Sequence, residues 1–68
     1  MTYNEYFLVT VYNTNGTKVV SRYDDLGEVI HTCNTWQKNF EKFGIEKIVV
    51  DSVCSFEGRR RYKTYLPL

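Results

Sequence analysis

The chain has 68 residues, of which 43% are hydrophobic, 25% charged and 16% aromatic, and its formal net charge at pH 7 is +1. At this length only one domain is possible and its core is thin, since a chain of about 60 residues buries only roughly 60% of its unfolded surface. The composition argues against disorder. We therefore predict a single α+β domain over residues 1–68, and we expect a complete small gene product because the sequence runs from Met1 to Leu68.

The charge is unevenly distributed along the chain. Residues 1–34 hold two basic and four acidic residues, whereas residues 35–68 hold seven basic and four acidic residues. The chain is therefore expected to be a dipole whose positive end is its last hairpin.

Targeting signals and cysteine content indicate a cytoplasmic protein. The segment from Met1 to Glu5 is polar and the apolar run after it is short, so we expect no secretory signal. No stretch approaches the roughly 20 apolar residues that would cross a membrane. Cys33 and Cys54 are too few for a disulfide framework, and we expect two reduced thiols that act as small core residues.

The first third of the chain predicts a β-hairpin. Residues 5–12 are β-branched and aromatic, as is typical of a strand. Asn15 and Gly16 favour a tight turn, because both central positions of a type I′ turn need a positive φ. Residues 17–23 then return as a second strand.

The middle of the chain predicts one helix over residues 25–43. Asp25 is followed by Glu28 three residues later, which indicates a helix N-cap. Apolar residues then recur at intervals of three and four, with Trp36 and Phe40 expected in the core. Gly44 follows as a residue able to end the helix in the left-handed conformation.

The last third predicts a second hairpin. Residues 46–56 and 59–66 have strand character, and Glu57-Gly58 lies between them as a tight turn. The element order is β-β-α-β-β, and antiparallel pairing in the spatial order 2-1-3-4 is the simplest solution. The single helix is expected to cover one face of this four-stranded sheet and to leave the other face open.

The first hairpin allows the two faces to be assigned. If Asn15 and Gly16 form a two-residue loop, one set of side chains faces the core, namely Phe7, Val9, Val11 and Val20. The open face then carries Tyr6, Leu8, Thr10, Tyr12, Val19 and Tyr23. This tyrosine-rich face is either a contact surface or a set of cross-strand pairs that stabilises a half-exposed sheet.

The residue inventory argues against catalysis and against metal or cofactor binding. His31 and Cys33 are two apart on a helix and point away from each other, so they cannot form a nucleophile and base. The one histidine and two cysteines lack the spacing of a zinc site, and each glycine stands alone, so no phosphate-binding loop exists. We expect His31 to be a solvated helix residue.

The last hairpin carries three of the four arginines of the chain. Arginine and tyrosine dominate recognition surfaces, and the expected partner-binding residues are Arg59, Arg60, Arg61, Tyr62, Lys63, Tyr65, Tyr6 and Tyr12. Strand alternation directs Arg59, Arg61, Lys63 and Tyr65 to one side and Arg60, Tyr62, Thr64 and Leu66 to the other.

Three interpretations of the basic strand remain open. Its cations and tyrosines could bind phosphates and stack on bases, although the pI of about 7.8 is low for a nucleic-acid-binding domain. They could instead dock on an acidic protein groove. A purely structural alternative is that the cations protect an edge strand or pair with Glu5, Asp51 or Glu57.

The size, element order and lack of catalytic residues resemble those of small bacteriophage inhibitors of host proteins, such as inhibitors of host RNA polymerase and anti-CRISPR proteins. The resemblance covers the whole chain but includes no diagnostic motif. It implies action by occlusion of a host enzyme or nucleic-acid-processing complex in the host cytoplasm.

We therefore expect a non-enzymatic protein-binding module whose partner is a host protein. A nucleic-acid-binding protein is the second hypothesis, and a structural or oligomeric accessory protein is the third. We expect no membrane partner and a monomer or homodimer. The triple change of Arg59, Arg60 and Arg61 to Ala is expected to weaken partner binding and to leave the fold intact.

Overall fold

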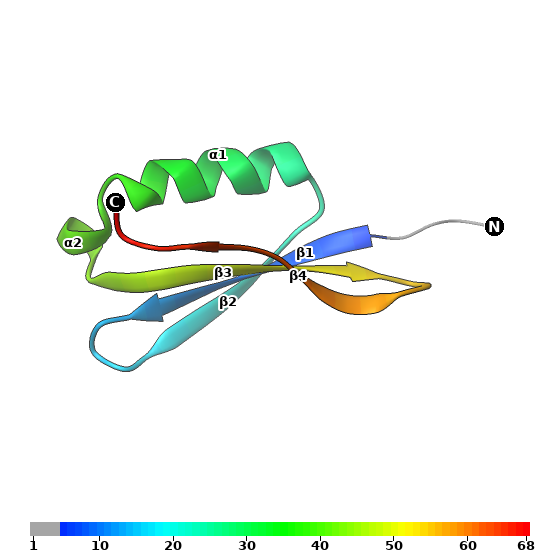
Figure 1. Cartoon of the computed structure of the whole chain (residues 1–68), viewed down its shortest axis with the longest axis horizontal. Coiled ribbons are helices and arrows are strands. Elements are labelled where there is room, and N and C mark those ends of the chain that lie inside the picture. Colours follow the sequence, from blue (N-terminus) through cyan, green and yellow to red (C-terminus); the bar gives the residue numbers. More distant parts are fainter. Residues whose placement is uncertain (1–4) are drawn as a thin grey trace.

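The computed structural model describes residues 5–68. Its four strands form one antiparallel sheet in the order β2-β1-β3-β4, as the sequence predicted. The strands are β1 (Glu5–Asn13), β2 (Lys18–Tyr23), β3 (Ile45–Cys54) and β4 (Gly58–Tyr65). Two helices connect β2 to β3, namely α1 (Leu26–Gln37) and α2 (Phe40–Phe43). Both helices lie on one side of the sheet (Figure 1).

The helical segment begins as predicted but is divided in two. The Asp25 side chain accepts a hydrogen bond from the Gly27 N–H at 3.3 Å, as expected of an N-cap. The prediction of one continuous helix over 25–43 is wrong, because the regular helix stops at Gln37. The side-chain amide of Asn39 donates to the Thr35 carbonyl at 3.3 Å, so it competes with the backbone pattern at that turn. The short second helix ends at Gly44, whose φ is 67°.

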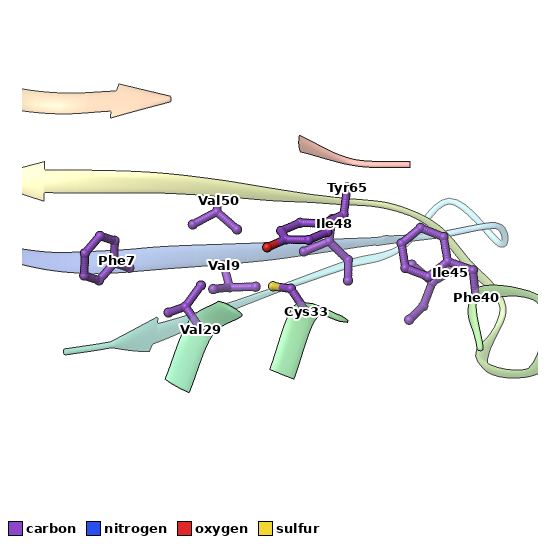
Figure 2. Packing of buried hydrophobic residues seen from close by; sticks show 9 residues of the cluster. All are labelled: Phe7, Val9, Val29, Cys33, Phe40, Ile45, Ile48, Val50 and Tyr65. Carbon is purple, nitrogen blue, oxygen red and sulfur yellow. The ribbon is translucent and has the colours of Figure 1, made fainter. Parts of the chain in front are cut away.

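The core lies between α1, α2 and the sheet face beneath them (Figure 2). Its apolar members come from every element except β2, and they are Phe7, Val9, Val29, Cys33, Phe40, Ile45, Ile48, Val50 and Tyr65. Phe40 is buried as predicted, whereas Trp36 is only partly buried at the edge of this cluster. Both cysteines are buried and no disulfide joins them.

The register of the first hairpin differs from the predicted register by one residue. The Gly16 N–H donates to the Asn13 carbonyl at 3.1 Å, and the Asn13 N–H donates to the Thr17 carbonyl at 2.8 Å. The loop therefore has three residues, 14–16, and Gly16 takes a φ of 91° at its end, as in a type I turn followed by a left-handed residue.

This longer loop exchanges the two faces of β2. Val19 lies opposite Val11, so Val19 and Tyr23 are on the helix side of the sheet. Val20 lies opposite Thr10 and is on the other side. The predicted faces of Val19, Val20 and Tyr23 are therefore wrong, because a shift of one residue moves every side chain of a strand to the opposite face.

The last strand contains a bulge that also changes the prediction. Lys63 pairs with Val50 and Arg61 pairs with Asp51, so Tyr62 is an extra residue between two regular stretches. Tyr62 reaches the helix side, where its ring meets that of Phe7 edge to face with centroids 6.4 Å apart. The predicted strict alternation along residues 59–66 is therefore wrong. Arg59 and Arg61 lie on the open side of the sheet, whereas Lys63 and Tyr65 lie on the helix side.

The two hairpins extend toward opposite ends of the molecule (Figure 1). The principal extents are 44, 22 and 15 Å. The β3–β4 hairpin, with its arginines, extends past the start of α1, and the C-terminus returns to the other end, where the Gln37 side chain donates to the Leu66 carbonyl at 2.7 Å. Within residues 5–68, no helix has the length and apolar character needed to span a membrane.

Candidate functional site

The sheet has one face that no helix covers. Because alternate residues of a strand point to opposite sides, the register assigns its side chains directly. We call this surface the open face, and it consists of Tyr6, Leu8, Thr10, Tyr12, Lys18, Val20, Arg22, Lys47, Val49, Asp51, Val53, Arg59, Arg61 and Thr64. Of the predicted members, Tyr6, Leu8, Thr10 and Tyr12 are confirmed there.

The central strands of the open face carry several side chains that are partly or almost fully buried. Thr10 and Val49 pair directly and are only 5% and 6% exposed although no helix lies over them. Leu8 and Val53 are half-buried, and Val20 at the edge is 53% exposed.

Two tyrosine rings on this face carry cations. The Arg22 guanidinium lies 4.0 Å from the centre of the Tyr6 ring, and the Lys47 ammonium lies 5.0 Å from the centre of the Tyr12 ring. Such cation–π contacts at exposed sites are worth about 0.5–1 kcal/mol each and hold the cation in place. Arg22 is also held by Asp24, whose carboxylate is 3.3 Å away. The positive charges are thus positioned by the surface rather than extended loosely into water.

A second cationic cluster surrounds Asp51. The Arg59 guanidinium donates to one carboxylate oxygen of Asp51 from Nε at 2.8 Å and from Nη2 at 2.6 Å. Arg61 donates from Nε to the other oxygen at 2.7 Å. The Asp51 side chain is only 6% exposed, whereas each arginine side chain is 59% exposed. Two arginines thus share one buried acid, and the cluster keeps a net positive charge with donors accessible to a partner.

Burial alone would raise the pKa of Asp51. The hydrogen bonds from Arg61 and Arg59, together with their charges, outweigh burial and hold the pKa of this carboxyl below its ordinary value of 3.8. Asp51 is therefore ionised at neutral pH and cannot serve as an acid there.

The open face concentrates the positive charge of the protein. At its strand-paired positions it carries five bases, Lys18, Arg22, Lys47, Arg59 and Arg61, against the single acid Asp51, while Asp24 lies at its margin beside Arg22. Its net charge is therefore +4 while that of the whole chain is +1, so the remainder of the chain sums to −3. The dipole inferred from the sequence runs across the sheet as well as along the chain.

The structure divides the eight predicted partner-binding residues among three environments. Four of them lie on the open face, namely Tyr6, Tyr12, Arg59 and Arg61. Arg60, Tyr62 and Lys63 are exposed on the helix side or at the β4 edge, and Arg60 pairs with Glu57 at 3.2 Å.

Tyr65 is the exception among these residues. It is 2% exposed and belongs to the core, with the Lys63 ammonium 4.5 Å from its ring centre. Burial raises the pKa of its hydroxyl, with smaller contributions from Cys33 and Tyr62. Its ring is therefore not available to a partner.

Three bases of the open face, Lys18, Arg22 and Lys47, were not predicted from the sequence as partner-binding residues. Lys18, Val20 and Arg22 are every second residue of β2, so they share one face, and that face is known once the loop length is known. Lys47 lies opposite Tyr12 across the β1–β3 pair, which only the tertiary register shows.

The two side chains considered for catalysis, His31 and Cys33, differ in their exposure to solvent. His31 is exposed on α1. Cys33 is fully buried, and burial raises the pKa of its thiol to about 11 despite the charge of Lys63, so the thiol is protonated at neutral pH. Within residues 5–68, no group of three or more His, Cys, Asp or Glu side chains is placed to hold a metal ion.

Comparisons with protein-family models, with curated proteins and with solved structures find no match for this chain.

Proposed function

We propose that this protein is a non-enzymatic binding module that docks its open face on an acidic surface of a partner protein. The observation that carries the proposal is the composition of that face, on which five bases lie among apolar side chains such as Leu8, Val49 and Val53. Protein interfaces combine apolar with polar side chains and are enriched in tyrosine and arginine. An acidic partner would match the charge and would be steered to this face.

The geometry favours a protein partner over a nucleic acid. Single-strand binding by a sheet depends on open aromatic rings on which bases stack. Here Arg22 and Lys47 already lie over the rings of Tyr6 and Tyr12, so a base would have to displace them. Apolar side chains such as Leu8 and Val53, in contrast, suit contact with a protein surface.

The proposed mode of action is occlusion. A rigid sheet that covers an acidic functional surface needs no catalytic group of its own, and the protonated thiol of Cys33 agrees with a non-enzymatic role. We further propose that the partner is a host enzyme or nucleic-acid-processing complex, following the resemblance to small bacteriophage inhibitors in size and element order.

A clean test must leave the arginines on Asp51 untouched. The change of Arg59, Arg60 and Arg61 to Ala is unsuitable, contrary to the expectation from sequence, because it would leave the buried Asp51 carboxylate without its two hydrogen-bond donors. We instead choose Arg22→Gln with Lys47→Gln on the open face. The matched control is Lys38→Gln with Lys42→Gln, which removes the same charge from the helices.

The experiment is affinity capture from a bacterial lysate, with partners identified by mass spectrometry and their binding then measured with purified components. We expect the wild type and the helix control to bind the same partner, and the open-face variant to bind it at least about tenfold more weakly. Equal loss in both variants would contradict the proposal. Titration with labelled oligonucleotides is the second arm, and submicromolar binding that the open-face variant alone loses would favour a nucleic acid instead.

A further inference from the structure

The two edges of the sheet are protected very differently. At one edge, β4 carries Arg59, Arg60, Arg61 and Lys63 and is interrupted by the bulge at Tyr62. Charged side chains and bulges are the devices by which proteins prevent an edge strand from pairing with another chain. The β4 edge is therefore closed to strand addition.

The opposite edge, β2, is less protected, because it has no bulge and only two of its six residues, Lys18 and Arg22, are charged. Its pairing with β1 is regular over all six residues, and β2 contains no proline. Val19 and Val20 are 56% and 53% exposed, one on each face of the sheet. Within the sheet of residues 5–68, β2 pairs with β1 alone. An exposed and regular edge without a bulge is a template for a further strand.

Backbone groups at this edge are directed outward at alternate positions. In an antiparallel pair, hydrogen-bonded and non-hydrogen-bonded positions alternate. Because the Asn13 N–H donates to the Thr17 carbonyl, the next positions that face away from β1 are Lys18, Val20 and Arg22. Their N–H and C=O groups are therefore oriented toward a strand added at this edge.

Charge selects the register in which β2 can pair with itself. A two-fold axis perpendicular to the sheet places the open faces of both copies on the same side. If most of the strand is to pair, this axis passes through either Val20 or Ser21. With the axis at Val20, Lys18 lies opposite Arg22 of the other copy, and two like charges meet twice. With the axis at Ser21, Lys18 at the start of β2 comes next to Asp24 of the other copy, the residue that directly follows β2, so opposite charges meet twice.

We propose that β2 pairs with β2 of a second copy of this chain, antiparallel and about a two-fold axis at Ser21, to form one continuous eight-stranded sheet. The only edges left in this dimer are the two protected β4 edges, so assembly closes at two copies and does not continue into a filament.

An apolar groove beside the edge supports the same register. This groove, of about 330 Å³, runs between the helices and the sheet and is lined by Val11, Asn13, Val19, Ser21, Trp36, Phe43 and Ile45. In the proposed register Tyr23 of the second copy lies opposite Val19, at the mouth of the groove. Phe43, which is 53% exposed, lines the same groove. Tyr23 would thus cover apolar surface that the monomer leaves in water.

The dimer does not depend on the proposed function, but it would extend it. A two-fold axis perpendicular to the sheet places both open faces on the same side. The two clusters of five bases would then form one surface that can engage two acidic sites at once.

The test is sedimentation velocity from about 1 µM to 1 mM at physiological salt. We expect a reversible dimer with a dissociation constant of roughly 10–100 µM, because a six-residue edge is small beside a standard interface of about 800 Å² per partner. Val20→Lys is expected to weaken the dimer about tenfold, since the new lysine lies opposite Arg22 of the second copy at both symmetry-related positions. Thr64→Lys, the matched change on β4, is expected to leave association unchanged.

Charge exchange tests the register. Lys18→Glu and Asp24→Lys are each expected to weaken the dimer, and the double variant is expected to return to within about threefold of the wild type. All these positions are exposed, so the monomer remains folded, which thermal unfolding verifies. A protein that stays monomeric throughout would overturn the proposal, as would equal effects of Val20→Lys and Thr64→Lys. Failure of the double variant to recover would overturn the register.

Discussion

Asp51 is the residue at which the charges of the open face are organised. It is the only acid there among the described residues, and it is buried beneath two arginines that are themselves mostly exposed. Pairing of the basic strand with nearby acids, one of the structural alternatives raised by the sequence, is thus seen for Asp51 and for Glu57. The Asp51 cluster nevertheless keeps a net positive charge, because two arginines share one carboxylate.

The lowered pKa of Asp51 makes stability depend on pH. A carboxyl whose pKa is lower in the folded protein than its ordinary value of 3.8 stabilises the fold above that value and loses this contribution as the pH falls through the lowered pKa. We expect Asp51→Asn to reduce the free energy of unfolding at pH 7 by about 1–3 kcal/mol. Urea unfolding between about pH 5 and 2 should show the difference from wild type shrinking as the pH falls.

Glu57→Gln is the control for this prediction, because Glu57 pairs with Arg60 while 61% of its side chain is exposed. It should change the free energy of unfolding by less than about 0.5 kcal/mol at any pH. An Asp51→Asn variant with wild-type stability at pH 7 would show that the arginines do not stabilise the fold through this carboxylate.

Tyr62 and Tyr65, which the sequence assigned alike to binding, should respond very differently to truncation. Tyr65→Ala removes a ring that is 2% exposed and should cost about 3–5 kcal/mol, enough to unfold much of a domain this small. Tyr62→Ala removes a ring that is 45% exposed and one edge-to-face contact with Phe7, at about 0.5–1.5 kcal/mol. Thermal and urea unfolding of both variants measure this, and equal losses would contradict the assignment of Tyr65 to the core.

At the scale of elements, one extra residue in each hairpin decides which side chains share a face. The additional loop residue before Thr17 moves Val20 and Arg22 to the open face. The bulge at Tyr62 allows Arg59 and Arg61 to lie on the open face while Tyr65 enters the core. Neither irregularity changes the number or order of the strands, yet together they assemble the cationic surface.

Deletion of Thr14 should leave the register of the first hairpin unchanged. The loop would shrink to Asn15 and Gly16, the turn that those residues favour, while Asn13 still pairs with Thr17. The cost should stay within about 1 kcal/mol, because the hydrogen bond from the Thr14 N–H to the Gly44 carbonyl is lost. Nuclear Overhauser contacts between Val11 and Val19 check the register, and contacts between Val11 and Val20 instead would show that the loop, not the core, sets it.

At the scale of the whole molecule, the sheet separates opposite charges. The open face carries a net +4 and the remainder of the chain −3, although the protein as a whole is nearly neutral. The central strands β1 and β3 are covered by helices on one side only (Figure 1). A nearly neutral protein can therefore present one strongly positive surface to an acidic partner.

Salt should weaken binding to the proposed partner through this surface. Raising the ionic strength from about 0.05 to 0.5 M shortens the Debye length from roughly 14 to 4 Å, so the association rate of the wild type should fall. The variant with Arg22→Gln and Lys47→Gln should show a smaller salt dependence, while Lys38→Gln with Lys42→Gln should behave as the wild type. Stopped-flow or surface-based kinetics measure both, and an association rate that is independent of salt would contradict electrostatic steering.

The sequence by itself determined the elements and their order. β-branched runs, the Asp25 cap and the left-handed Gly44 are local signals, because they depend on backbone sterics and on hydrogen bonds between near neighbours. The strand order followed from the one helical segment between β2 and β3 and from short connections. The signals of the single elements are fixed within a few residues of chain, so one sequence suffices to predict them, although it did not show that the helical segment is divided after Gln37.

The tertiary structure alone decided the faces and therefore the candidate site. Whether the Asn15-Gly16 turn takes two residues or three, and whether Tyr62 is bulged, depends on which register buries Val9, Val50 and Tyr65 against the helices. That choice is made by packing between segments far apart in the sequence. Because side chains alternate along a strand, each shift of one residue reverses a face. Residue patterns alone could therefore not place Arg22 beside Tyr6, nor choose Asp51 for Arg61 among the candidate acids Glu5, Asp51 and Glu57.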